Sequence, residues 1–464
     1  MTALSLPRPH RLRPLAILGA ALVLVAASQA ADLLGLTAAP QAPARPAEPV
    51  TEAVSGPVAP AGAPITGAPG SLEIIDHSIA AWTANVAANG ADFLSAANLG
   101  TLYEARARLS GDVGDYTRAT AAAERSLAIE PRQLDVQALH ARLQFAVHDF
   151  SRALSEAQAT DRVAPNQPGV LAIIADASLE LGDVEGAAAL YARIEALAPG
   201  PAITARLARV AFLRGDPAGA VAMAEAAQAA AKADGIAGPA LSWYAYLAGT
   251  MHLAAGAPEA AAAWYDTAIA DWPGSYLALA GRARAAAALG DTDAAIASYG
   301  AAIAVAPQPD ALTALGDLLA LRGDAKGAEQ QYATVLAIAA LQGSGGLVYN
   351  RQLVLFNVNH GRDLAAALVL AEQELQQRHD VYGHDAYAWA LLANDRAAEA
   401  DAAMTKALAF GTRDAMLLFH AGEIKAALGD TAAARSYLAD ALAIRGALDP
   451  LAAERAAASL AAIR

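Results

Sequence analysis

The sequence predicts an all-α protein built as a stack of repeated helix pairs, and two observations support this. Apolar residues make up 56% of the 464 residues and aromatic residues only 5%; most of the apolar residues are alanine, which has the highest helix propensity. The stretches GDVEGAAALYARIEALAP, from Gly182, and GDTDAAIASYGAAIAVAP, from Gly290, share Gly-Asp, then Ala, Tyr and Pro at matching places. One helix pair cannot bury its apolar face alone, whereas a stack of pairs can.

The charge balance and the lack of cysteine exclude several classes of protein. The chain has 32 basic and 46 acidic residues and a net charge of −14, whereas a nucleic-acid binder shows a basic patch or stripe. A chain without cysteine has no disulfide, no thiolate zinc site and no cysteine nucleophile. We therefore expect no nucleic-acid partner.

Residues 1–36 have the layout of a secretory signal peptide or of an N-terminal membrane anchor. Three arginines precede an uninterrupted apolar run at residues 15–27, and Ser28 and Ala30 stand where a signal peptidase requires small residues. Residues 15–36 also match the roughly 20 residues that span a bilayer, so cleavage and anchoring both remain open. Because the arginines stay inside, we expect an exported chain, in the periplasm or at the cell surface. A membrane is a partner only through this anchor.

The segments that follow lead into the repeats. Residues 37–70 are rich in Pro, Ala and Gly and carry almost no large apolar side chain. Such a segment cannot bury enough surface to offset its ordering entropy, so we expect a disordered linker. Residues 71–90 lie just before the repeats and are expected to form a capping helix.

The repeats occupy residues 91–448, and each is marked by a glycine or its substitute between two helices. Successive markers are 34, 34, 33, 41, 34, 33, 38, 34 and 34 residues apart. A residue at this place turns left-handed, which glycine does without strain. The ten markers are Gly114, His148, Gly182, Gly215, Gly256, Gly290, Gly323, Gly361, Asp395 and Gly429.

The other places of the repeat also have physical reasons. The aspartate after the marker can accept the free amide hydrogens of the second helix, as expected for Asp115, Asp149, Asp183, Asp216, Asp291, Asp324 and Asp430. A small residue is needed where the two helices come closest, and this place holds Ala119, Ala153, Ala187, Ala220, Ala261, Ala295, Ala328, Ala400 and Ala434. A tyrosine four residues later is expected to wedge between repeats, at Tyr191, Tyr265, Tyr299 and Tyr332. Proline stops the second helix at Pro131, Pro165, Pro199, Pro273 and Pro307.

Irregular spacings predict local departures. About two extra helical turns precede Gly114, the 41-residue step around residues 226–240 predicts a lengthened second helix, and residues 341–347, LQGSGGL, predict a flexible joint. Residues 449–464 are expected to close the stack as a C-terminal capping helix.

This period and pattern resemble the tetratricopeptide repeat, a helix–turn–helix unit. The stretches HDAYAWALLANDRAAEA and ALAFGTRDAMLLFHAGEIKAALGD, which ends at Asp430, resemble the closing repeats of a group of exported bacterial tetratricopeptide proteins of unestablished chemistry. The resemblance implies an α-solenoid of about ten tetratricopeptide repeats forming a right-handed superhelix.

The resemblance also implies a concave groove, lined by the first helices, that binds extended peptides or partner helices. Arginine and aromatic residues dominate binding hot spots, and they gather at two places along the predicted groove. The middle patch holds Arg206, Arg209, Trp243, Tyr246 and Arg284, and the second patch holds Arg351, Tyr382, Trp389 and Phe419. The same aromatic side chains can instead pack between helices. The complete set of candidate groove residues is Arg142, Asp176, Arg206, Arg209, Trp243, Tyr246, Arg284, Asp317, Arg351, Tyr382, Trp389, Phe419 and Glu423.

A search for chemistry finds little that favours an enzyme. The pairs His379-Asp380 and His384-Asp385 suggest a metal, but a spacing of five is poor for a shared ligand face on a helix. Neither a phosphate-binding glycine loop nor a zinc-binding HExxH motif is present. We expect no catalytic residues, no metal and no cofactor. A metal-dependent enzyme that uses the two histidines is the weakest hypothesis.

The sequence therefore favours a non-catalytic, exported scaffold that binds proteins or peptides in a groove. The alternative is a ligand-sensing or regulatory module associated with an envelope transporter, with a small molecule bound between repeats. A ligand that binds the folded state raises the melting temperature, which separates these two hypotheses.

Overall fold

The computed structural model describes residues 72–344 and 350–463. Within these ranges the chain forms 22 helices and no strand, so the all-α prediction is confirmed. None of the helices described is both long and apolar enough to cross a membrane. The predicted signal or anchor (1–36), the linker (37–70) and the last part of the predicted joint (345–347) lie outside the described residues.

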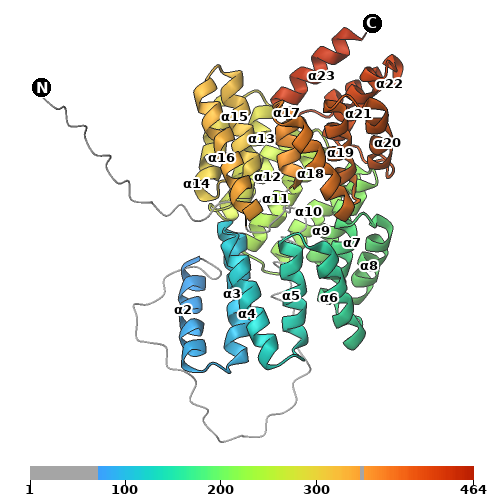
Figure 1. Cartoon of the computed structure of the whole chain (residues 1–464). Helices are drawn as coiled ribbons and strands as arrows, with labels where there is room; N and C mark the ends of the chain where they lie inside the picture. Colours follow the sequence, from blue (N-terminus) through green and yellow to red (C-terminus); the bar gives the residue numbers. More distant parts are fainter. Residues whose placement is uncertain (1–71, 345–349, 464) are drawn as a thin grey trace, which may run out of the picture.

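Twenty of the helices form ten consecutive helix–turn–helix repeats, as predicted, and one further helix lies at each end (Figure 1). The terminal helices are α2 (Leu72–Ala88), which packs on α3, and α23 (Pro450–Ala462), which packs on α21 and α22. The ten pairs are α3 (Phe93–Ser110) with α4 (Gly114–Ile129), α5 (Leu134–Ala146) with α6 (Phe150–Val163), α7 (Pro168–Glu180) with α8 (Val184–Leu197), α9 (Pro201–Leu213) with α10 (Pro217–Ala233), α11 (Gly238–Ala254) with α12 (Pro258–Asp271), α13 (Tyr276–Ala288) with α14 (Thr292–Val305), α15 (Pro309–Leu321) with α16 (Ala325–Ser344), α17 (Asn350–Asn359) with α18 (Leu364–Gln377), α19 (Val381–Ala393) with α20 (Ala397–Ala407), and α21 (Ala415–Ala427) with α22 (Thr431–Ala443).

The turn inside each pair follows the predicted chemistry in nine repeats. The marker residues from His148 to Gly429 have φ between 60° and 97°, the left-handed region in which glycine is unstrained. Six of the seven predicted aspartates accept a hydrogen bond from a backbone amide three residues later. These caps are Asp149, Asp183, Asp216, Asp291, Asp324 and Asp430.

The first repeat departs from the prediction. The left-handed residue there is Gly111 (φ 72°), and Gly114 instead begins α4. Asp115 does not cap the helix: it is buried and forms ion pairs with Arg106 at 2.7 Å and Arg118 at 2.5 Å. The predictions for Gly114 and Asp115 were wrong because the left-handed residue of this three-residue connection is its first, Gly111, so that Gly114 and Asp115 already belong to α4.

The predicted packing residues are buried. The nine alanines expected at the closest approach of the two helices are at most 3% exposed. Tyr265 fills the space between two first helices, since a Cβ atom added to Gly249 or Gly281 would lie 2.8 Å or 2.3 Å from its ring. Each of the five predicted prolines is the second residue after the last residue of its helix, as expected of a helix stop.

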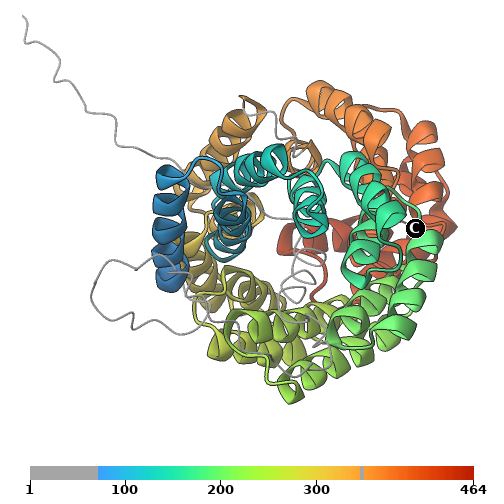
Figure 2. The ribbon, with the colours of Figure 1, turned by 90° about the horizontal axis from the view of Figure 1, so that it is seen from below.

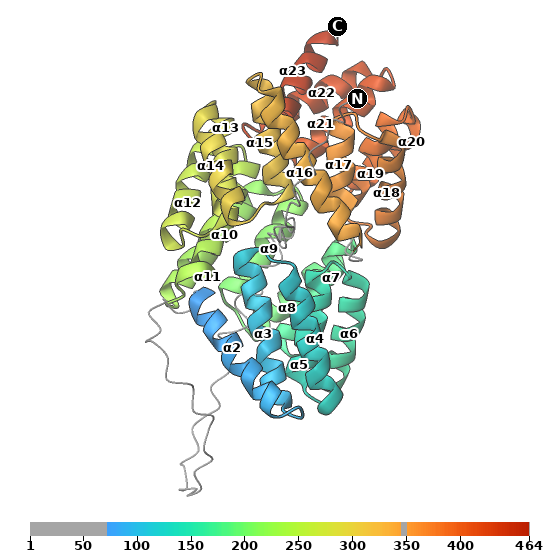
Figure 3. The ribbon, with the colours of Figure 1, turned by 60° about the vertical axis from the view of Figure 1, so that its left-hand side comes forward.

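The repeats wind into a right-handed superhelix. Seen from below in Figure 2, the chain runs clockwise from the blue helices through green and yellow to orange, while Figure 1 shows that it climbs away from that viewpoint. Figure 3 shows the upper turn, with α17 to α20, stacked above the lower turn that contains α3 to α8.

Adjacent turns of the superhelix touch one another. The turn of the third repeat lies against the connection between the eighth and ninth repeats, where a Cβ atom on Gly182 would be 2.6 Å from the carbonyl oxygen of His379. A Cβ atom on Gly215, one repeat later, would be 2.3 Å from the carbonyl oxygen of Gly411. Thr412 Oγ1 donates a 2.5 Å hydrogen bond to the carbonyl oxygen of Leu213 at the same place. Glycine therefore serves both the turn and the contact between superhelical turns.

The small residue between paired helices can be tested with Ala295→Phe. Ala295 is fully buried, so a phenylalanine there forces α13 and α14 apart and is expected to destabilise the fold by about 1–3 kcal/mol. Thermal unfolding measures the effect, and Ala301→Phe, on the exposed face of the same helix, is the matched control. An unchanged melting temperature for Ala295→Phe would contradict the packing described here.

The contact between superhelical turns can be tested with Gly215→Ala. Gly323 has a similar φ of 83°, but no atom lies within 4 Å of the position of an added Cβ. Gly323→Ala is therefore expected to lower the free energy of unfolding only through the left-handed backbone, by about 1–2 kcal/mol. Gly215→Ala also forces the turns apart and is expected to cost at least about 1 kcal/mol more in a denaturant titration. Equal losses in the two variants would show that the turns do not press together.

Candidate functional site

Six of the thirteen predicted groove residues are buried between helices. Their side chains pack among their neighbours, which is the alternative that the sequence left open, although Asp317 also lines the cavity described below; a partner contact for these six residues stays a prediction. They are Asp176, Arg206, Trp243, Asp317, Trp389 and Phe419.

The two buried aspartates join helices within and between repeats. Asp176 accepts hydrogen bonds from Tyr191 Oη at 2.6 Å and from Arg206 Nε at 2.9 Å, which links the third and fourth repeats. Asp317 accepts a 2.7 Å bond from Tyr332 Oη and lies 2.8 Å from His360 Nε2. Buried carboxylates need such partners, because an unpaired buried charge is costly.

The aromatic residues of the second patch form part of the core. Trp389 Nε1 donates a 2.8 Å hydrogen bond to Asn359 Oδ1, and its ring stacks on His420 with centroids 4.1 Å apart. Phe419 lies beside Trp389, at a centroid distance of 5.6 Å. Trp243 of the middle patch is likewise buried, in a cluster with Phe212 of α9 and Ala220 of α10, so these rings pack between helices.

Three further predicted residues, all arginines, are held in ion pairs. Arg142 binds both carboxylate oxygens of Glu104 at 2.7 Å. Arg209 lies 2.5 Å from Glu180, and Arg351 lies 2.7 Å from Asp380. These ion pairs engage the three guanidinium groups within the protein.

The last two pairs belong to a network that crosses between superhelical turns. Arg378 pairs with Glu180 of the lower turn and, at 3.2 Å, with Asp380 of the upper turn. Although burial alone raises it, the pKa of Asp380 is lowered overall by Arg351 and Arg378. The guanidinium of Arg378 also lies over the ring of Phe150, 4.7 Å from its centroid. Nothing in the sequence marks a pair of residues 198 positions apart, so sequence reasoning missed this network.

Tyr382 and Glu423 are partly buried on the inner helices of the last repeats. Tyr382 Oη donates a 3.5 Å hydrogen bond to Asp414. Glu423 Oε1 is buried and has no hydrogen-bond partner among the residues described.

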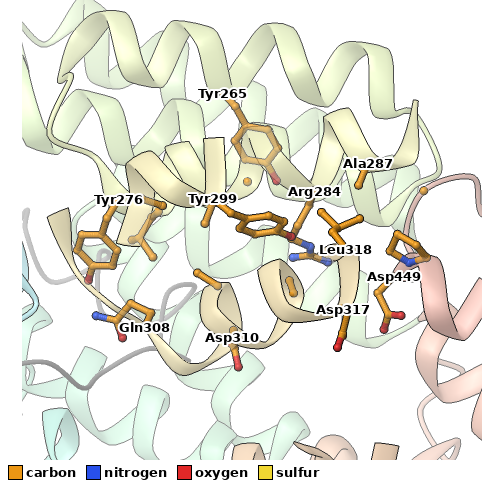
Figure 4. Close-up of a pocket in the computed structure, with 18 of the residues that line it drawn as sticks. Tyr265, Tyr276, Arg284, Ala287, Tyr299, Gln308, Asp310, Asp317, Leu318 and Asp449 are labelled. Atoms are coloured by element: carbon orange, nitrogen blue, oxygen red, sulfur yellow. The ribbon is translucent and has the colours of Figure 1, made fainter. Parts of the chain in front are cut away.

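The two remaining predicted residues, Tyr246 and Arg284, line a cavity inside the superhelix (Figure 4). Its volume is about 350 Å³. Helices α11 to α15 supply most of its wall, and residues 446–450, which connect α22 to α23, contribute to the remainder. The cavity thus joins the fifth to seventh repeats to the end of the chain.

Arg284 is the cation of this cavity. Its side chain is exposed and forms no hydrogen bond or ion pair with any described residue. Arg282, two residues earlier on the same helix, instead pairs with Asp266 at 3.3 Å and does not line the cavity.

A tyrosine contact that recurs in other repeats is absent at Arg284. In the third and seventh repeats, the tyrosine of the second helix donates to an aspartate fifteen residues earlier on the first helix. In the fifth repeat, Tyr265 Oη lies 3.4 Å from Thr250 Oγ1 in the same arrangement. In the sixth repeat Arg284 takes the place of the acceptor, opposite Tyr299. A guanidinium only donates, so Tyr299 has no acceptor there.

Carboxylates lie on the other side of the guanidinium in Figure 4, across from Tyr265 and Tyr299. Burial raises the pKa of Asp310 to about 7, although Arg284 opposes that rise. Burial also raises the pKa of Asp449, whose Oδ1 accepts a hydrogen bond from the amide of Ala452. Asp310 forms no ion pair with any described residue, so Arg284 and Asp310 both lack a charged partner within the described part of the chain.

The predicted histidine–aspartate pairs do not converge. The rings of His379 and His384 are 6.5 Å apart, Asp380 belongs to the ion-pair network, and Asp385 binds His420 Nδ1 at 2.8 Å. Asp380 also caps α19, by accepting hydrogen bonds from two of its first amides. Across the part of the chain that the structure describes, no group of three or more His, Cys, Asp or Glu side chains is placed to hold a metal ion.

No family model matches the sequence, and no curated protein matches it. Solved structures with a similar fold include human IFIT1, as a dimer with PPP-AAAA, at 14% identity over 80% of this chain and 87% of that one, with a TM-score of 0.44. A tetratricopeptide repeat protein from Parabacteroides merdae ATCC 43184 is 13% identical over 52% of this chain and 93% of its own, with a TM-score of 0.37. The type IV pilus biogenesis factor PilW is 18% identical over 44% and 93%, with a TM-score of 0.38. Likenesses this distant indicate no function. The resemblance to tetratricopeptide repeat proteins rests on the ten helix pairs of the chain itself.

The electrostatics of the cavity can be tested with Asp310→Asn. A carboxyl whose pKa is higher in the folded state than in the unfolded state costs stability as the pH rises from the unfolded to the folded value. For Asp310 that window runs from about 4 to about 7. The asparagine variant should be equally stable at pH 4 and about 1–3 kcal/mol more stable above pH 7. Unfolding measured across this range checks the trend, and a difference that does not change with pH would contradict it.

Proposed function

We propose that the chain is a non-catalytic protein-interaction scaffold that works outside the cytoplasm and holds an extended segment of a partner inside its superhelix. One observation carries this proposal. Most of the candidate groove residues are committed to contacts between helices, whereas Arg284 and the tyrosine hydroxyls of the cavity keep free hydrogen-bonding capacity. Arginine and tyrosine are the residues on which protein interfaces most often depend. The export pattern of residues 1–36 supports the location.

The shape of the interior favours an extended segment over a partner helix. A cavity of about 350 Å³ holds only a few residues, and an α-helix with its side chains is about 10 Å across. The superhelical turns touch at Gly182, Gly215 and Thr412, which closes the side of the superhelix there. These contacts favour entry of a partner segment from an end of the superhelix.

A second candidate function is the sensing of a small molecule, as in a regulatory module of an envelope transporter. The size of the cavity favours it, because small-molecule sites typically measure about 300–1,000 Å³ and are mostly apolar with a few placed polar groups. The alanines and leucines of α13 and α15 supply that apolar lining around Arg284.

The leading proposal is tested by affinity capture from a cell-envelope extract with the wild type and two charge reversals. Partners bound through the cavity should be recovered by the wild type and by Arg282→Glu, and lost with Arg284→Glu. Arg282 is the matched control because it lies on the same helix but outside the cavity. Partners recovered equally by all three proteins would rule out binding through this cavity.

A further inference from the structure

The cavity places two hydrogen-bond donors side by side without an acceptor. Tyr299 is only 4% exposed, its ring is fixed among buried side chains of α13 to α15, and its hydroxyl forms no hydrogen bond with a described residue. Arg284 stands where the equivalent tyrosines of other repeats find their acceptor. A carboxylate between Tyr299 and Arg284 would satisfy both groups, and an arginine binds a carboxylate through two parallel hydrogen bonds.

The carboxylates on the opposite side of the cavity favour a cationic group of the ligand. Asp310 has no ion pair among the described residues, and Asp449 uses one carboxylate oxygen to cap α23 and keeps the other. Asp317 is less available because Tyr332 and His360 already hold it. The three carboxylates outnumber the single guanidinium, so a purely anionic ligand would satisfy Arg284 but face repulsion from the aspartates.

We propose that this cavity binds a small amphoteric ligand, an amino acid or short peptide, with its α-carboxylate on Arg284 and Tyr299 and its α-ammonium group on the side of the cavity that carries Asp310 and Asp449. The proposal rests on the second function proposed above and names its ligand class. The volume of about 350 Å³ holds a short peptide as well as a single amino acid, and alanines and leucines line the space left for its side chains. The tyrosine rings Tyr246, Tyr265 and Tyr276 add flat apolar walls.

The proposal is tested by thermal-shift titration of the full chain with free amino acids and glycine-containing dipeptides. Each is compared with its N-acetylated form, which lacks the ammonium group, and its C-terminal amide, which lacks the carboxylate. At least one free compound should raise the melting temperature in a saturable way, and either blocking group should abolish most of the shift. Equal shifts with the blocked forms, or no saturable shift with any compound, would overturn the proposal.

Variants show whether the ligand sits in this cavity. Tyr299→Phe removes one hydroxyl and keeps the ring, so it should fold normally and weaken binding about tenfold. Arg284→Gln should weaken binding about tenfold or more, whereas Arg282→Gln should leave it unchanged. Asp310→Asn should weaken the binding of the free compound. It should leave the small thermal shift caused by the N-acetylated form unchanged. A ligand whose affinity survives both Tyr299→Phe and Arg284→Gln binds elsewhere, and the proposal fails.

The result is separable from that of the scaffold proposal. If the cavity binds no amphoteric compound but envelope partners are still lost with Arg284→Glu, only the ligand proposal fails. If an amphoteric ligand binds and the Arg284→Glu variant captures the same partners as the wild type, the scaffold proposal fails at this site. The ligand proposal then stands.

Discussion

The close contact between the two helices of each pair is the constraint on which the rest of the structure depends. Alanine at the same place in nine repeats leaves no side chain between the helices beyond a methyl group, and these alanines are almost completely buried. A constant separation makes the repeats nearly identical units, and identical units that stack at a constant angle form a superhelix. The cavity, the contacts between turns and the position of Arg284 all follow from that regular winding.

Local features of the fold could be predicted from the sequence because each depends on neighbours in the chain. The left-handed turn at Gly290, the cap at Asp291 and the stop at Pro307 need only the residues beside them, and all three are present. The first repeat shows the limit of this reasoning. Gly111 follows the last residue of α3 and Gly114 begins α4, and periodicity alone selected the wrong one as the left-handed residue.

The candidate site could be predicted only in part. Most of the predicted groove side chains form contacts across repeats, as Arg206 does with Asp176 over 30 residues. The pairing depends on the angle between adjacent repeats, which no local pattern specifies. One useful signal was present in the sequence but was overlooked. Tyrosine follows the ninth residue of the first helix at a fixed distance in several repeats, and an arginine at that ninth place in the sixth repeat removes the acceptor.

The ion pair between Glu180 and Arg378 has a consequence for how the chain reaches its native state. A solenoid whose repeats touch only their neighbours has low contact order and can zip up from any point along its length. Here a contact spans 198 residues, so the closure entropy of a very long loop must be overcome before the lower and upper layers join. Once joined, the middle repeats can no longer fray one at a time. The layers therefore couple into one cooperative unit, and the late step of folding is their docking rather than the addition of another repeat.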